Sequence, residues 1–85
     1  MPYIESEGRP LIGDHARRLG NHVFNPGELN NAITTTIVAY LGSGPHYRDF
    51  NEVIGVLECV KQELYRRMIA PYEDQAMARN GDVFP

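Results

Sequence analysis

Apolar residues recur most regularly in the stretch from Tyr47 to Asn80. They are separated by steps of three and four residues, which places them on one face of an α-helix of about 3.6 residues per turn. This face comprises Phe50, Val53, Leu57, Val60 and Leu64. It is widened by Ile54, Val56, Met68 and Ile69, so we expect it to pack against more than one neighbour. Pro71 cannot donate to the carbonyl of Arg67 and crowds it, so one long helix with a kink or break near Pro71 is predicted.

A short helix is predicted over residues 9–19, with Pro10 in its first turn and Gly20-Asn21 as a stop that can take positive φ. The residues before it, Met1–Gly8, show no helical period and are predicted to form an extended arm around an apolar pair. A second arm of similar character is predicted at Asp82–Pro85, after Asn80-Gly81 ends the long helix. Arms of this kind need a surface to lie on, either the chain's own core or a neighbouring subunit.

A helix of medium length is predicted to begin at Asn25, whose side chain can cap the free amides of a first turn. Pro26 suits the first helical position, and Glu28 completes a capping box. Apolar residues at a spacing of four then continue to Gly42. The β-branched run Thr34–Thr36 favours a strand by propensity, but the spacing on both sides of it favours a helix.

The pattern therefore predicts an all-α protein of three helices, short, medium and long with a Pro kink, in a single domain over residues 1–85. At about 1.5 Å per residue the long helix would extend roughly 50 Å, more than a compact chain of this size can cover. A chain of 85 residues also buries too little surface to be very stable alone. We therefore expect a homo-oligomer in which the terminal arms pack across subunits.

Charge and hydropathy exclude several classes of partner. Eight Lys and Arg against eleven Asp and Glu give a net charge of −3, which disfavours binding to the nucleic-acid backbone. No apolar run approaches the roughly 20 residues that span a bilayer, and the N-terminus lacks the features of a signal peptide. We expect a cytoplasmic protein that does not bind membranes.

No motif in the sequence points to an enzyme, a cofactor or a metal ion. The single Cys59 excludes an internal disulfide and is predicted to be a small buried hydrophobe of the long helix. The three histidines lie in separate segments without the spacing of ligands or of a catalytic triad. We therefore predict a protein without catalytic or metal-ligating residues.

One stretch has residues suited to a ligand. Arg66 follows Gln62, Cys59 and Gly55 at helical spacing, which gives a stripe of small and polar residues beside the apolar face. Such a stripe can line a groove for a small anionic ligand, in which arginine binds phosphate or carboxylate and a tyrosine stacks on a ring. The candidate ligand-binding residues are Arg66, Arg67, Tyr65, Tyr72 and Glu58. Alternatively, Glu63 pairs with Arg67 and both arginines only solvate the outer face or bridge subunits.

Four segments carry a family resemblance: Ile54–Lys61, Glu63–Arg67, Ala70–Asp74 and Asn80–Phe84. With the opening Met-Pro-Tyr-Ile, they resemble a family of small uncharacterised proteins carried by phages and prokaryotes. The resemblance implies no established activity. By analogy of size and context, it suggests the small phage proteins that sequester nucleotide signals of host immunity, in the host cytoplasm.

The leading hypothesis is a non-enzymatic accessory protein that binds a small anionic ligand, such as a nucleotide immune signal, in a groove between subunits. The alternative hypothesis is a protein-interaction module that inhibits or scaffolds a host or phage protein through its terminal arms.

Overall fold

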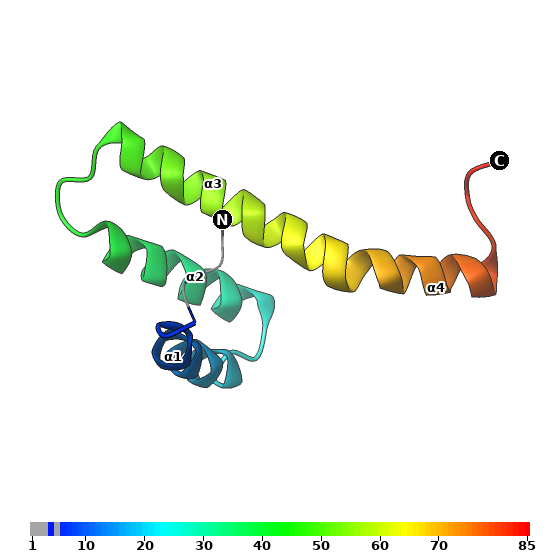
Figure 1. Cartoon of the computed structure of the whole chain (residues 1–85), viewed down its shortest axis with the longest axis horizontal. Coiled ribbons are helices and arrows are strands. Elements are labelled where there is room, and N and C mark those ends of the chain that lie inside the picture. Colours follow the sequence, from blue (N-terminus) through cyan, green and yellow to red (C-terminus); the bar gives the residue numbers. More distant parts are fainter. Residues whose placement is uncertain (1–3, 5) are drawn as a thin grey trace. The chain divides into compact units, whose positions relative to one another are not determined.

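The computed structural model describes Ile4 and residues 6–85; the other residues of the predicted N-terminal arm lie outside the described part. Helices follow one another as α1 (Arg9–Asn21), α2 (Pro26–Leu41), α3 (Tyr47–Leu64), the π-helical turn η1 (Tyr65–Ile69) and α4 (Ala70–Asn80) (Figure 1). Since α3, η1 and α4 adjoin without a gap, the described residues form three helical segments. The described residues contain no strand, and the predicted all-α class is confirmed.

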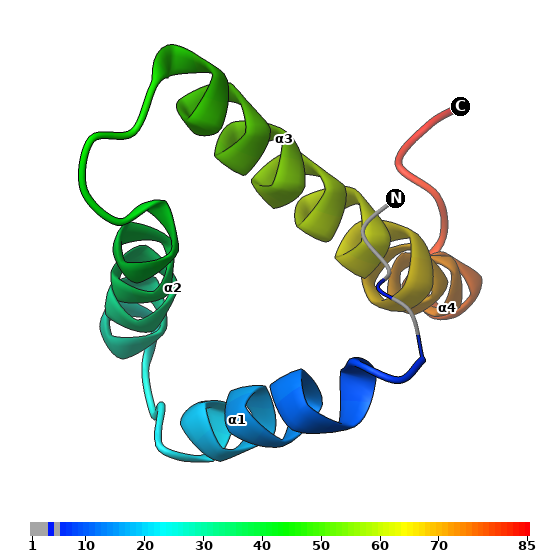
Figure 2. The same cartoon turned by 60° about the vertical axis from the view of Figure 1, so that its left-hand side comes forward.

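The chain divides into two compact units, Met1–Val53 and Ile54–Pro85. The first unit holds α1, α2 and the first turns of α3. Within it, α1 and α2 lie at a steep angle to each other, and the loop after α2 reverses the chain into α3 (Figure 2). The second unit holds the rest of α3, η1, α4 and the C-terminal segment.

The start and the end of α1 differ from the prediction. Residues 6–8 form a turn, in which the amide of Arg9 donates to the carbonyl of Ser6 at 3.4 Å, so this part of the arm is not extended. The helix continues through Gly20, whose φ is not positive, and ends at Asn21. His22 closes it, since its amide donates to the carbonyl of Leu19 at 3.0 Å and its Nδ1 lies 2.7 Å from the carbonyl of Arg18.

The predicted cap of α2 is confirmed with one change of partner. The side-chain oxygen of Asn25 accepts a hydrogen bond from the amide of Glu28 at 2.8 Å. The carboxylate of Glu28 reaches one residue further back than in a simple capping box and accepts from the amide of Phe24 at 2.7 Å. The β-branched run is helical, and the hydroxyl of Thr36 donates to the carbonyl of Ala32 at 2.7 Å. Local capping and apolar spacing thus outweigh β-propensity in this helix.

Two glycines shape the loop between α2 and α3. Gly42 and Gly44 have φ of 66° and 74°, conformations that side chains with a Cβ rarely adopt. His46 then begins α3: its carbonyl accepts from the amide of Asp49 at 2.9 Å, and its own amide donates to the Asp49 carboxylate at 2.8 Å. The carboxylate of Asp49 also lies in the first turn, where negative charge stabilises a helix.

The predicted kink near Pro71 takes the form of a π turn. The amide of Ala70 donates to the carbonyl of Tyr65, five residues earlier, and Pro71 then occupies the first turn of α4. A proline there has no amide to donate, and the wider π turn accommodates the ring without ending the helix. Figure 1 shows the helix axis changing direction in this part of the second unit.

No described residue is buried. The apolar face of α3 remains open, with Leu57, Val60 and Leu64 exposed by 36%, 46% and 48%. Cys59 is exposed too, so its prediction as a buried hydrophobe is wrong. The amphipathic pattern predicts which face of the helix is apolar and needs burial. It does not predict whether the same chain buries that face.

Candidate functional site

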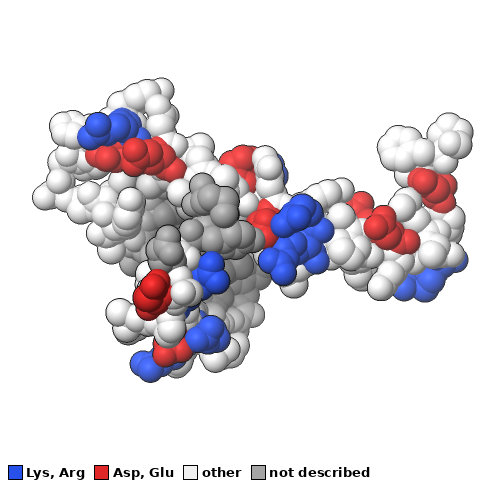
Figure 3. Space-filling model, in the orientation of Figure 1, with Lys and Arg blue, Asp and Glu red and all other residues white. Residues whose placement is uncertain are grey.

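A three-residue ion cluster lies at the junction of α3 and η1. Arg66 Nη2 donates to both carboxylate oxygens of Glu63 at 3.3 Å, and Arg67 Nη1 donates to Glu63 Oε1 at 3.4 Å. The Glu63 side chain is 29% exposed, against 73% and 65% for the two arginines. The alternative prediction, an ion pair between Glu63 and Arg67, is confirmed. Figure 3 shows basic side chains gathered at this part of the helix.

This cluster has more positive than negative charge. Two guanidinium groups share one carboxylate, and Arg66 uses a single terminal nitrogen for its contact. An arginine presents five N–H donors, so most of those of Arg66 point to solvent. A phosphate or carboxylate group can therefore approach Arg66 without first breaking the ion pair.

Glu58, another predicted ligand residue, belongs to a separate group. Its Oε2 accepts from Gln62 Nε2 at 3.1 Å, and its Oε1 lies 3.7 Å from Lys61 Nζ. The Glu58 side chain is 50% exposed. A half-exposed carboxylate needs no buried partner, and Glu58 pairs along its own helix rather than with either arginine.

Tyr65 interacts with an acidic residue of α4. The pKa of Tyr65 is raised above its ordinary value, first by the negative charge of Glu73 and next by a hydrogen bond to it. Desolvation and the charge of Asp74 add smaller contributions. Each of these causes favours the neutral phenol. Tyr65 is half exposed, so the contact lies at the surface.

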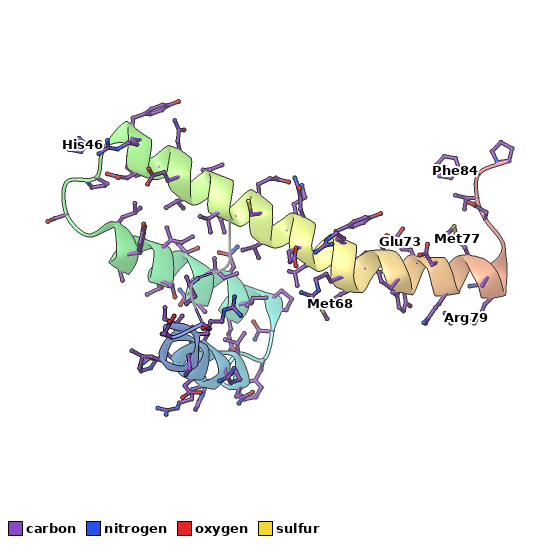
Figure 4. The ribbon with its side chains drawn as sticks, viewed as in Figure 1. His46, Met68, Glu73, Met77, Arg79 and Phe84 are labelled. Carbon is purple, nitrogen blue, oxygen red and sulfur yellow. The ribbon has the colours of Figure 1, made fainter. Side chains whose placement is uncertain are left out.

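The π turn explains how Tyr65 reaches a residue eight positions away. In an unbroken α-helix two such residues point about 80° apart. A π turn adds about one residue to a turn, which removes about 100° and leaves the two side chains nearly in line. Figure 4 shows Glu73 on the same side of α4 as Met77, and Met68 and Arg79 on the other side. Sequence reasoning missed this contact because it assumed α-helical spacing throughout.

The five predicted ligand residues are therefore not one constellation. Arg66 and Arg67 share the ion cluster, Glu58 pairs elsewhere on α3, and Tyr65 contacts Glu73. Tyr72 joins none of these groups and is 66% exposed. The structure brings together only the two arginines of the predicted set.

The first unit contains a shallow hollow of about 590 Å³ between the end of α1 and the start of α2. Its wall is apolar at Leu19, Val23 and Ala32 and polar at His22 and Glu28. Both polar groups already serve the helix ends, since His22 contacts the carbonyl of Arg18 and Glu28 accepts from the amide of Phe24. These polar groups therefore cap helices and do not converge on a ligand.

No described group of three or more His, Cys, Asp or Glu side chains is placed to hold a metal ion. Within the same part of the chain, no helix combines the length and the apolar character that crossing a bilayer requires.

A protein family described as a domain of unknown function (DUF6899) matches residues 1–83. The chain belongs to this family. The match covers nearly the whole length of both compact units, so the helices and the arginine cluster lie within the family's domain. No curated protein and no solved structure matches the chain significantly. The family carries no assigned activity, and its association with phages stays a prediction.

Proposed function

We propose that this chain is a non-enzymatic binding protein that works as a homo-oligomer. One observation carries the proposal: in the second unit, which contains a single helical run, the apolar residues Leu57, Val60 and Leu64 of α3 are exposed by 36%, 46% and 48%. Association of copies supplies the cover that the apolar face of α3 lacks, because burial of apolar surface is the main force that drives association.

Matched variants on two faces of α3 test the assembly. Leu64→Lys places a charge on the apolar face, whereas Gln62→Lys places the same charge elsewhere on the helix, four residues after Glu58. Sedimentation equilibrium is expected to show monomers for the first variant and unchanged oligomers for the second. Equal masses for the two variants, with helicity intact by circular dichroism, would contradict assembly through this face.

We propose that this oligomer binds a small anionic ligand of the nucleotide class. The observation behind it is the excess positive charge of the Arg66–Arg67 cluster, together with the mostly unused donors of Arg66. Phosphate groups are bound by arginine through paired N–H donors. The ring of Tyr65, next in sequence and half exposed, offers a stacking face.

Calorimetric titration with mono-, di- and cyclic nucleotides tests this site. The Arg66→Ala, Arg67→Ala double variant is expected to lose binding, whereas Arg79→Ala, which removes an arginine from the last turn of α4, keeps it. Binding that survives in an oligomeric double variant would place the ligand elsewhere.

A protein partner is the second candidate, and the C-terminal segment favours it. Val83 and Phe84 are 92% and 78% exposed, and the amide of Phe84 donates to the Asp82 carboxylate at 2.9 Å. A turn that presents two apolar side chains suits insertion into another protein. Deletion of Asp82–Pro85 is then expected to abolish capture of that protein and to leave nucleotide binding unchanged.

A further inference from the structure

We propose that two copies of the chain pair in antiparallel orientation along α3, η1 and α4, with the π turn at the centre of the contact. The occupant of the apolar face is thus a second copy of this chain. This inference rests on the self-association proposed above and specifies its geometry.

The composition of the second unit creates the need for a partner. Ile54–Pro85 contains one continuous helical run and a short C-terminal segment. A single helix cannot fold its own apolar stripe inward, because all residues of a stripe point to the same side. Leu57, Val60, Leu64 and Ile69 of this unit are exposed by 36% to 48% and are available to a second helix.

The π turn makes the apolar stripe continuous across Pro71. With α-helical spacing, Leu64 would be followed on its face by Arg67 or Met68 and then by Pro71 itself. The π turn places residues five apart in line, so Ile69 follows Leu64 instead. The contact between Tyr65 and Glu73 independently indicates the same change of register. The resulting stripe comprises Leu57, Val60, Leu64, Ile69, Tyr72 and Ala76.

This stripe is approximately symmetric about the midpoint between Arg66 and Arg67, because Val60 and Tyr72 lie one residue out of register. Reversal of the helix about that point places Leu57 opposite Ala76 and Leu64 opposite Ile69, so apolar side chains meet at the centre and at each end of the contact. Both arginines bend toward Glu63. We place this cluster off the stripe, where the like charges of two copies do not face each other.

Charge complementarity selects the antiparallel direction. Lys61 and Glu73 flank the stripe on one side and lie about 5.5 and 6.5 residues from the same midpoint, so reversal brings the opposite charges to within about one residue, or about 1.5 Å, of the same level. A parallel pair would instead bring Lys61 to the level of its own copy. Lys61 is free to reorient, since its side chain is 77% exposed and its Nζ is 3.7 Å from Glu58.

Cysteine cross-linking tests the direction. In a Cys59→Ala background, a tagged Lys61→Cys chain is mixed with an untagged Glu73→Cys chain and oxidised mildly. Because a disulfide requires Cβ atoms about 4 Å apart, the mixed product is expected to form at least about tenfold faster than the product of Lys61→Cys alone. Faster linkage of Lys61→Cys to itself would establish a parallel pair and overturn the proposal.

Charge reversal gives a second readout that does not depend on oxidation. Lys61→Glu and Glu73→Lys are each expected to weaken dimerisation by up to about fivefold, and the double variant to restore it. If neither cross-links nor restoration are found while Leu64→Lys still yields monomers, the antiparallel geometry fails and the self-association stands. If the unmodified chain is monomeric, both fail.

Discussion

At the scale of single residues, Tyr65 reports on the geometry of the π turn. Its neutral form is favoured by Glu73, so its folded-state pKa lies above its ordinary value of about 10. The contribution of this contact to stability is therefore present below pH 10 and is lost as the pH rises through the folded-state pKa.

We predict that Glu73→Gln lowers the pKa of Tyr65, because both the charge and the charged hydrogen-bond acceptor are removed. The measurement is a spectrophotometric titration of the phenols, with Tyr65→Phe to assign the signal among the five tyrosines. Asp74→Asn is the matched control and is expected to have a smaller effect, since Asp74 is the last of the causes. Identical titrations for Glu73→Gln and the unmodified chain would contradict the contact.

Gly55 is a second informative residue. It lies in the middle of α3, where glycine costs up to about 1 kcal/mol relative to alanine, and a Cβ added there would meet nothing within 4 Å. Among the described residues, no atom lies close enough to Gly55 to require the absence of a side chain there. On the proposed pair, Gly55 also faces away from the stripe.

Gly55→Ala is therefore expected to raise the free energy of unfolding by about 0.5–1 kcal/mol and to leave the oligomer mass unchanged. Denaturant titration and sedimentation measure the two quantities. A loss of stability or of mass would mean that another chain packs directly on Gly55.

At the scale of elements, the junction of α3 and α4 depends on Pro71. Pro71→Ala restores an amide donor, so α-helical hydrogen bonding becomes available and the π turn is expected to relax. Tyr65 and Glu73 would then point about 80° apart, and the pKa of Tyr65 would fall toward its ordinary value even as the helix becomes locally more regular. A Tyr65 pKa that stays raised in Pro71→Ala would show that the register does not depend on the proline.

The helix boundaries that the sequence predicts well are those set by local chemistry. Asn25 and Glu28 cap α2 through atoms a few residues apart, and Gly81, with φ of 86°, ends α4 as predicted. Gly20 does not end α1, because the amide of His22 can close the helix without a positive φ. The π turn follows from Pro71 and the apolar spacing together, and α-helical periodicity alone does not reveal it.

At the scale of the whole molecule, the exposed ion pairs contribute little to stability. Among the described residues, four ion pairs each join residues three or four positions apart, one in α1 and three in α3 and η1, and the side chains of their cations are at least 65% exposed. Such pairs are typically worth less than about 1 kcal/mol each. The apolar residues must therefore supply most of the stability, and within the described part of the chain none of them is buried. The periodicity of the sequence shows that the apolar stripe must be buried. It does not show whether the same chain or a second chain buries it.

The arginine cluster connects the assembly to the proposed ligand. In an antiparallel pair the Arg66–Arg67 clusters of both copies lie at the same level, beside the centre of the contact. Of the candidate residues predicted from the sequence, the structure brings Arg66 and Arg67 together at Glu63, whereas Glu58 pairs with Gln62 and Lys61 along its own helix.

The most direct test of this account is the mass of the purified chain by native mass spectrometry over a range of concentrations. We expect a discrete species of at least twice the 9.6 kDa chain mass, and additional mass when a bound nucleotide is present. A species of 9.6 kDa at every concentration would contradict self-association, and with it the cover proposed for the apolar stripe.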